Sequence, residues 1–222
     1  MIALVFGNSD GFVRLFDGAE PFHGTNPISV AVPSGQGNPW LLDMATSSVP
    51  FNRVELHQSL QRDLPRGVAS DSDGGDTTDP FCAEMLAPLG GSDFGFKGAA
   101  LGGVAEIFSA VLTGMRLSPD IAPMAGPDFL RAREMGAFVI VMDPVAFVAA
   151  PLVEAGMTRY LALLRGSKPR AGQYVMAPGD REWARAAHRQ VTGIPLDPIT
   201  VTNFSQLAED YKVKLPWHTG PS

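Results

Sequence analysis

The stretch that decides the fold runs from Ile28 to Met44 and reads ISVAVPSGQGNPWLLDM. Its first five residues alternate between large apolar and small side chains, which is typical of a half-buried strand. The Pro- and Gly-rich segment 33–39 predicts a loop, and the apolar segment 40–44 predicts a second strand. The two strands are expected to pair antiparallel, because a parallel return needs a crossover of about a dozen residues or more.

Two more strands are predicted outward from this pair, at 2–6 and 137–142, because both segments are apolar runs of strand length. Segment 66–80 is rich in Asp, Gly, Ser and Thr and predicts a loop. Segment 115–136 contains several prolines and no sustained period, and predicts a long excursion over the surface.

Five helices are predicted. The first is capped by Ser47 or Ser48, takes Pro50 into its first turn and reaches about Gln61. The clearest helix follows Lys97, where apolar side chains at helical spacing predict a buried face. These are Leu101, Val104, Ala105, Phe108, Val111 and Leu112, with Gly114 as the stop. The others lie at Val153–Leu164, which Gly166 ends, and open at Asp180 and at Asn203.

The mixture of strands and helices shows no regular βαβ alternation, no repeat and no linker. The sequence therefore predicts an α/β (α+β) chain, with a mixed, largely antiparallel sheet flanked by helices. We expect residues 1–222 to form a single unit.

Composition narrows the range of partners. The chain has 222 residues, 45% of them hydrophobic and 18% charged, and a net charge of −6 without a basic cluster, which argues against nucleic acid as a partner.

Cys82 is the single cysteine and is interpreted as a small buried hydrophobe rather than a nucleophile, in keeping with a reducing cytoplasm. Segment 98–115 is interpreted as a buried helix rather than a membrane span, because Glu106 lies near its centre. No signal peptide is visible at the start of the chain.

Several ligand motifs fail in detail. Gly35-Gln36-Gly37 lacks the third glycine of a Rossmann dinucleotide site. The acidic stretch Asp71–Asp76 does not match a calcium loop and is interpreted as a solvated loop. The histidines His23, His57, His188 and His218 lack metal-site spacing. His23 is a candidate base, although a solvated loop histidine is favoured.

Two short strings are suggestive of a ligand. Pro178-Gly179-Asp180 precedes a predicted helix, where a glycine lets a ligand approach and helix N–H groups favour anions, although Asp180 as a helix cap is the simpler reading. Lys97 stands at a predicted helix start, where a lysine opposes the helix dipole.

A set of ordered motifs resembles the malate/L-lactate dehydrogenase family, whose members are NAD(P)-dependent oxidoreductases not built on a Rossmann fold. The motifs are Gly24-Thr25-Asn26-Pro27, Asp43-Met44-Ala45-Thr46-Ser47, Thr77-Thr78-Asp79-Pro80, Pro88-Leu89-Gly90-Gly91 and Lys97-Gly98. The resemblance extends from Ile2 to about Leu207.

The resemblance implies a cofactor, NAD or NADP, and a set of residues that hold it: Ser9, Asp43, Met44, Ala45, Lys97, Pro178, Gly179 and Asp180. Two interpretations of Arg53 stand equal: it contacts the 2′-phosphate of NADP, or it is a solvated surface arginine. The resemblance also implies a 2-oxo acid, 2-hydroxy acid or cyclic imine as substrate and a homodimer. Neither nucleic acid nor membrane is expected as a partner, on the charge and hydropathy given above, and a cytoplasmic location is expected from the cysteine content.

The chain also departs from the family. Members begin with a helical N-terminal region whose His-Gly motif supplies the proton donor, and the resemblance places that region upstream of Met1. We therefore expect no catalytic residue in this chain and interpret it as an N-terminally truncated enzyme. No metal ligand is expected either, because the histidines lack metal-site spacing. The alternative is a non-catalytic nucleotide-binding or structural remnant. The loop Gly90–Gly95 is expected to be longer than the family form.

Overall fold

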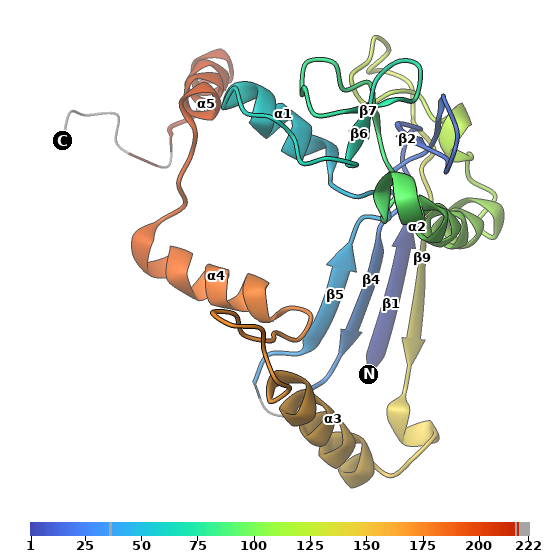
Figure 1. Ribbon diagram of the computed structural model, residues 1–222, viewed down its shortest axis with the longest axis vertical. Coiled ribbons are helices and arrows are strands. Elements are labelled where there is room, and N and C mark those ends of the chain that lie inside the picture. The colour runs from blue at the N-terminus through green and yellow to red at the C-terminus, as the bar shows by residue number, and fades with distance from the viewer. Residues whose placement is uncertain (36, 216, 218–222) are drawn as a thin grey trace.

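The computed structural model describes residues 1–35, 37–215 and 217, so Gln36 and His218 lie outside the described residues. One sheet of four strands has the order β5-β4-β1-β9, with antiparallel pairing throughout. Its strands are β1 (Ile2–Gly7), β4 (Ile28–Val32), β5 (Trp40–Met44) and β9 (Ala137–Met142). All four were predicted, and the antiparallel β4–β5 pair is confirmed. Figure 1 shows α2 at one end of these strands, α3 beyond the other end and α4 beside the edge strand β5.

A second sheet, of order β3-β2-β8-β6-β7, was missed. Only β2 and β8 pair in parallel. Its strands have two or three residues each: β2 (Val13–Arg14), β3 (Pro21–His23), β6 (Ala69–Ser70), β7 (Asp76–Thr77) and β8 (Met85–Leu86). The prediction of an all-loop segment 66–80 was therefore wrong, because β6 and β7 form a short antiparallel pair inside it.

The first helix, α1 (Phe51–Ser59), is capped differently from the prediction. Pro50 is the N-cap residue and neither serine bonds to the helix. Ser47 Oγ instead donates to the Val49 carbonyl at 2.7 Å, and Ser48 Oγ donates to the Pro88 carbonyl at 2.8 Å. Both hydroxyl groups therefore fix the connection between β5 and α1.

The long helix α2 (Gly91–Glu106) continues into a π-helical turn, Ile107–Val111, and Gly114 at φ +70° ends it as predicted. It begins at Gly91, so Lys97 lies in its second turn and not at its start, and Gly90–Gly95 is largely helix and not loop.

The predicted buried face of α2 was wrong in part: Ala105 is buried and Phe108 stacks on Phe6, but the other predicted residues are exposed. Small residues face inward, at Gly91, Gly95, Gly98, Gly102 and Ala105. A Cβ on Gly98 would collide with the backbone of Leu89, so glycine allows the helix to pack directly against that segment. The larger apolar side chains of Leu101, Val104, Val111 and Leu112 are exposed. By length and composition alone, the helical stretch Gly91–Val111 could span a membrane. Within it, 39% of an apolar stretch of 18 residues is buried inside the protein.

Two 3₁₀ turns interrupt the remaining irregular chain, at Ser118–Asp120 and Pro144–Ala146. Helix α3 (Ala150–Arg165) ends at Gly166 as predicted. Helix α4 (Asp180–Thr192) opens where predicted, but Gly179 and not Asp180 is its cap. Helix α5 (Pro198–Asp210) begins before Asn203, because the Asp197 carboxylate accepts from the backbone N–H groups of Ile199 and Thr200 and caps it there.

Candidate functional site

Two segments far apart in the sequence share one cavity of about 700 Å³. Asp43 and Met44 lie at the end of β5, and Pro178 and Gly179 form the turn before α4. The backbone N–H of Leu41 donates to the Pro178 carbonyl at 3.2 Å and joins the two segments. A volume of this size is typical of sites for small molecules and cofactors.

Gly179 is required by this junction. It has φ +93°, and a Cβ there would lie 3.0 Å from Trp183 Nε1 and 3.2 Å from Leu41 Cβ. Trp183 Nε1 itself donates to the Pro39 carbonyl at 3.3 Å. The first turn of α4 is therefore fastened to β5, an edge strand of the sheet, and the glycine allows that contact.

The Asp180 carboxylate holds the turn in place. It accepts two hydrogen bonds from Arg165, at 2.9 and 2.7 Å, and one from the Ala177 backbone N–H at 2.9 Å. The bond from Arg165 is the main cause that lowers the pKa of Asp180. Glu182 adds a second carboxylate to the first turn of α4, so the helix N-terminus already has acidic groups beside it.

The other predicted cofactor residues do not line this cavity. Ala45 directly follows Met44. The Ser9 hydroxyl oxygen is buried and has no hydrogen-bond partner within the described part of the chain, and its role in cofactor binding stays a prediction. Lys97 is exposed, with Nζ 5.2 Å from the ring centroid of Phe94 and 5.8 Å from that of Phe96. Its role in cofactor binding stays a prediction.

His23 is not a solvated loop residue, as was expected. It lies on β3 and its side chain is buried, at 8% exposure. Burial lowers its pKa, and the negative charge of Glu106 only partly opposes this effect. The imidazole is held within the protein beside Thr46 and Gly102, where burial favours its neutral form.

A buried polar network was missed. The Glu106 carboxylate accepts hydrogen bonds from Asn26 Nδ2 at 2.6 Å and from the N–H and hydroxyl of Ser118 at 2.5 and 2.6 Å. Asn26 is fully buried and has φ +34°. This network fixes the Gly24–Pro27 turn against α2. The sequence feature that could have indicated this network is Glu106, an acidic residue inside an otherwise apolar helix.

The thiol of Cys82 is exposed, contrary to the prediction of a buried residue. Its Sγ donates to Asp79 Oδ2 at 3.4 Å, and this bond is the main cause that raises the pKa of Cys82, which disfavours a reactive thiolate. Asp71 Oδ1 accepts from the N–H groups of Asp73 and Gly75 and closes the acidic loop on itself. No group of three or more metal-ligating side chains was found among the described residues.

A second cavity, of about 620 Å³, lies along α4 and was not predicted. Three arginines and one histidine are among the residues that line it. The sequence signal that could have found the arginines is their regular spacing, with one at every fourth position: Arg181, Arg185 and Arg189. Arg181 lines both cavities, so the two are adjacent.

Comparison with known proteins identifies the family to which these features belong. Over 215 residues the chain is 30% identical to a Δ1-pyrroline-2-carboxylate reductase of Agrobacterium fabrum, covering 94% of this chain and 59% of the reductase. It is 30% identical to an NAD⁺ ureidoglycolate dehydrogenase of Escherichia coli O157:H7, covering 88% and 55%. It is also 30% identical to an NADP⁺ (2R)-3-sulfolactate dehydrogenase of Chromohalobacter salexigens, covering 66% and 43%.

The fold is similar to that of solved dehydrogenases. The crystal structure of malate dehydrogenase from Entamoeba histolytica superposes with a TM-score of 0.86 at 25% identity, covering 97% of this chain and 63% of that one. The chain thus spans less than two thirds of the length of these relatives. The sequence profile of malate/L-lactate dehydrogenases matches residues 1–205. The predicted resemblance is confirmed, and the chain belongs to the malate/L-lactate dehydrogenase family.

Proposed function

We propose that this chain is the cofactor-binding part of an NAD(P)-dependent oxidoreductase. One observation carries the proposal. A single cavity of cofactor size is lined both by Asp43-Met44 and by Pro178-Gly179, although Met44 and Pro178 are 134 positions apart in the sequence. The substrate would be a 2-oxo acid, a 2-hydroxy acid or a cyclic imine, in keeping with the names of the relatives.

The cofactor would carry the hydride: NADH or NADPH would donate it to a 2-oxo acid or cyclic imine, and NAD⁺ or NADP⁺ would accept it from a 2-hydroxy acid. The residues of this chain would bind and orient the cofactor. The exposed carboxylate of Asp43 is suited to polar groups of the nucleotide, and the Ser9 hydroxyl, buried and without a partner among the described residues, would need a bond from the nucleotide. The Lys97 ammonium is exposed on α2 and is suited to a phosphate or carboxamide oxygen.

The proton donor is assigned to a part of the enzyme outside this chain. His23 is a poor candidate, because burial lowers its pKa and its ring faces the protein interior. The relatives are longer than the matched region, and we propose that their additional part supplies this group. We further propose that the enzyme is a cytoplasmic homodimer, since the exposed apolar side chains on α2 would be covered by a partner.

Titration of the purified chain with NADH and NADPH, followed by nucleotide fluorescence, tests the proposal. We expect binding, and no turnover with a panel of 2-oxo acids and cyclic imines. Asp43→Ala should weaken binding, whereas Asp73→Ala, which removes an exposed carboxylate in the acidic loop, should not. Absence of nucleotide binding, or equal effects of the two variants, would contradict the proposal. Robust turnover would show that a proton donor lies within this chain.

A further inference from the structure

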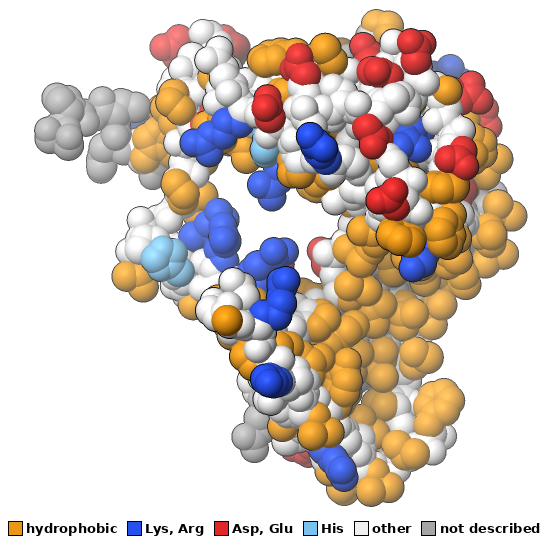
Figure 2. All heavy atoms as spheres, viewed as in Figure 1, with side chains coloured by type: hydrophobic (Ala, Val, Ile, Leu, Met, Phe, Trp, Pro, Cys, Tyr) orange, Lys and Arg blue, Asp and Glu red, His pale blue; other side chains and the backbone are white. Residues whose placement is uncertain are grey.

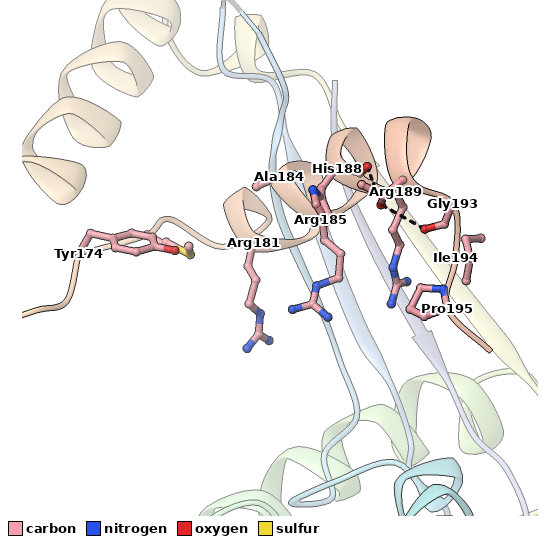
Figure 3. Close-up of a pocket in the computed structure, with 11 residues that line it drawn as sticks. Tyr174, Arg181, Ala184, Arg185, His188, Arg189, Gly193, Ile194 and Pro195 are labelled. Carbon is pink, nitrogen blue, oxygen red and sulfur yellow. Dashed lines mark hydrogen bonds between the residues drawn. The ribbon is translucent and has the colours of Figure 1, made fainter. Parts of the chain in front are cut away.

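Helix α4 presents a continuous row of positive charge. Arg181, Arg185 and Arg189 follow one another at intervals of four residues, which places them on one face of the helix. Figure 3 shows their three guanidinium groups extending to the same side of α4. Together with His188 and Tyr174 they line the cavity of about 620 Å³. We call the three arginines the α4 arginine row.

The charge of this row is poorly balanced within the protein. Arg181 approaches Glu182 at 3.4 Å, in a pair whose side chains are 75% and 58% exposed. No ion pair of Arg185 or Arg189 occurs among the described residues. Like charges four residues apart destabilise a helix, and the whole chain is acidic, with a net charge of −6. The mutual repulsion of the row is therefore unfavourable to the helix, although Arg189 lies in the last turn, where the helix dipole favours a cation, and the row opposes the overall charge.

The row also lies beside the proposed cofactor cavity. Arg181 lines both cavities, and Gly179 immediately precedes α4. Figure 2 shows Lys and Arg side chains gathered around the opening between α4 and the part of the molecule that carries α1. A nucleotide held at Asp43 and Gly179 would therefore have a basic surface within reach along α4.

We infer that the α4 arginine row binds the 2′-phosphate of NADP and makes the site prefer NADP to NAD. This inference rests on the proposed function. The row extends over about 12 Å, from eight residues at 1.5 Å per residue, which suits an extended nucleotide better than a single small carboxylic acid. Guanidinium groups bind phosphate monoester oxygens bidentately, and NAD lacks that monoester. Tyr174, at the end of the cavity nearest Arg181, offers a ring face on which adenine can stack.

The test compares NADH and NADPH binding, by nucleotide fluorescence, to the chain and to two double variants. We expect the unmodified chain to bind NADPH at least tenfold more tightly than NADH. Arg185→Ala/Arg189→Ala should remove this preference and leave NADH affinity within twofold. The control, Arg159→Ala/Arg170→Ala, removes two exposed arginines elsewhere and should retain the preference. Circular dichroism establishes that each variant folds.

The outcomes separate this inference from the proposed function. The inference would be overturned if the unmodified chain bound both nucleotides equally, or if its preference for NADPH survived Arg185→Ala/Arg189→Ala. In either case, observed binding of NADH would leave the proposed function in place. A chain that binds neither nucleotide would overturn both. Competition separates the sources of phosphate: 2′,5′-ADP should displace NADPH at concentrations where inorganic phosphate and 5′-AMP do not. Equal displacement by inorganic phosphate would assign the row to a free anion and overturn the assignment to NADP.

Discussion

Arg165 and Asp180 join the end of α3 to the start of α4. The Nε and Nη2 atoms of Arg165 donate hydrogen bonds of 2.9 and 2.7 Å to the two carboxylate oxygens of Asp180. The same carboxylate accepts from the backbone N–H of Ala177, two residues before Gly179. This pair therefore sets the course of the turn that forms one wall of the proposed cofactor cavity.

Arg165→Ala should lower nucleotide affinity more than it lowers stability. The Arg165 side chain is 46% exposed, so its ion pair contributes about 1 kcal/mol or less to folding. Loss of the pair releases the Pro178-Gly179 turn, and we expect a severalfold weaker NADH affinity with a small change in melting temperature. Arg165→Lys should restore little, because lysine lacks the two-pronged geometry. An affinity equal to that of the control Arg159→Ala would show that the pair does not position the turn.

Lys97→Ala should weaken nucleotide binding without unfolding the chain. The ammonium group contacts only the rings of Phe94 and Phe96 among the described residues, and such exposed cation–π contacts contribute about 0.5–1 kcal/mol. A charged hydrogen bond to a ligand is worth roughly 1.5–3 kcal/mol, which corresponds to an affinity loss of tenfold or more. Titration and thermal melts of the same samples measure both quantities. Unchanged affinity, in an assay that detects the loss in Asp43→Ala, would remove Lys97 from the site.

The main sheet was predictable because its strands are five or six residues long, enough for an apolar run or an alternation to appear. The second sheet was not, since strands such as Val13–Arg14 are too short to carry a period. In α2 the helical period was correct, but only Ala105 and Phe108 of the predicted face are packed, and the larger aliphatic residues are exposed. Glycine and alanine repeat at the same spacing as the larger apolar residues, and the smaller set allows close backbone packing.

The candidate site was predictable only through the family resemblance. Nothing local in the sequence indicates that Leu41 bonds to Pro178 or that Asp43 and Gly179 share a cavity. The placement of Lys97 at a helix start failed because Gly90-Gly91 was interpreted as loop, whereas Gly90 at φ +106° caps the helix. Side-chain partners such as Glu106 and Ser118 depend on tertiary contacts that carry no sequence period.

Glu106→Ala should destabilise the chain substantially. The carboxylate accepts three hydrogen bonds from Asn26 and Ser118 in a buried site, and its removal leaves the Ser118 backbone N–H and one N–H of the Asn26 amide without an acceptor. The Ser118 hydroxyl keeps Asn26 Oδ1 at 3.3 Å, and Asn26 Nδ2 keeps the Gly102 carbonyl at 3.2 Å. An unsatisfied buried donor costs about 1–3 kcal/mol, so we expect the free energy of unfolding to fall by at least roughly 2 kcal/mol. Urea denaturation measures the change, with exposed Glu209→Ala on α5 as the control. Equal midpoints for the two variants would contradict a structural role for the network.

The start of α5 should respond to acid through Asp197. Hydrogen bonds, chiefly from Thr200 and also from Ser59, lower the pKa of Asp197 from its ordinary 3.8 to about 2. Because the folded pKa is depressed, the carboxylate stabilises α5 fully above about pH 4, and this stabilisation is lost as the pH falls toward 2. Hydrogen exchange of the α5 amides should therefore quicken beyond its intrinsic pH dependence over this interval. Asp197→Asn should abolish the step and Asp73→Asn should retain it; a step that persists in Asp197→Asn would assign it to another group.

The chain should self-associate through apolar side chains on α2 and its π-helical turn. Val111 and Leu112 are 60% and 58% exposed, and Val139 and Val141 on the edge strand β9 are 58% and 56% exposed. Figure 2 shows hydrophobic side chains gathered over the β4, β1 and β9 part of the sheet. Apolar patches of this kind drive association, and an unpaired strand edge adds a second route.

Light scattering at several concentrations should therefore show dimers or larger species, with a melting temperature that rises with concentration. Val111→Glu/Leu112→Glu should shift the chain toward monomer, because burying two carboxylates in an apolar interface is unfavourable. The control, Gln190→Glu/Asn203→Glu, adds the same charge at exposed positions on α4 and α5 and should not. A strictly monomeric chain with a concentration-independent melting temperature would show that these side chains stay exposed to solvent, and would contradict the proposed homodimer.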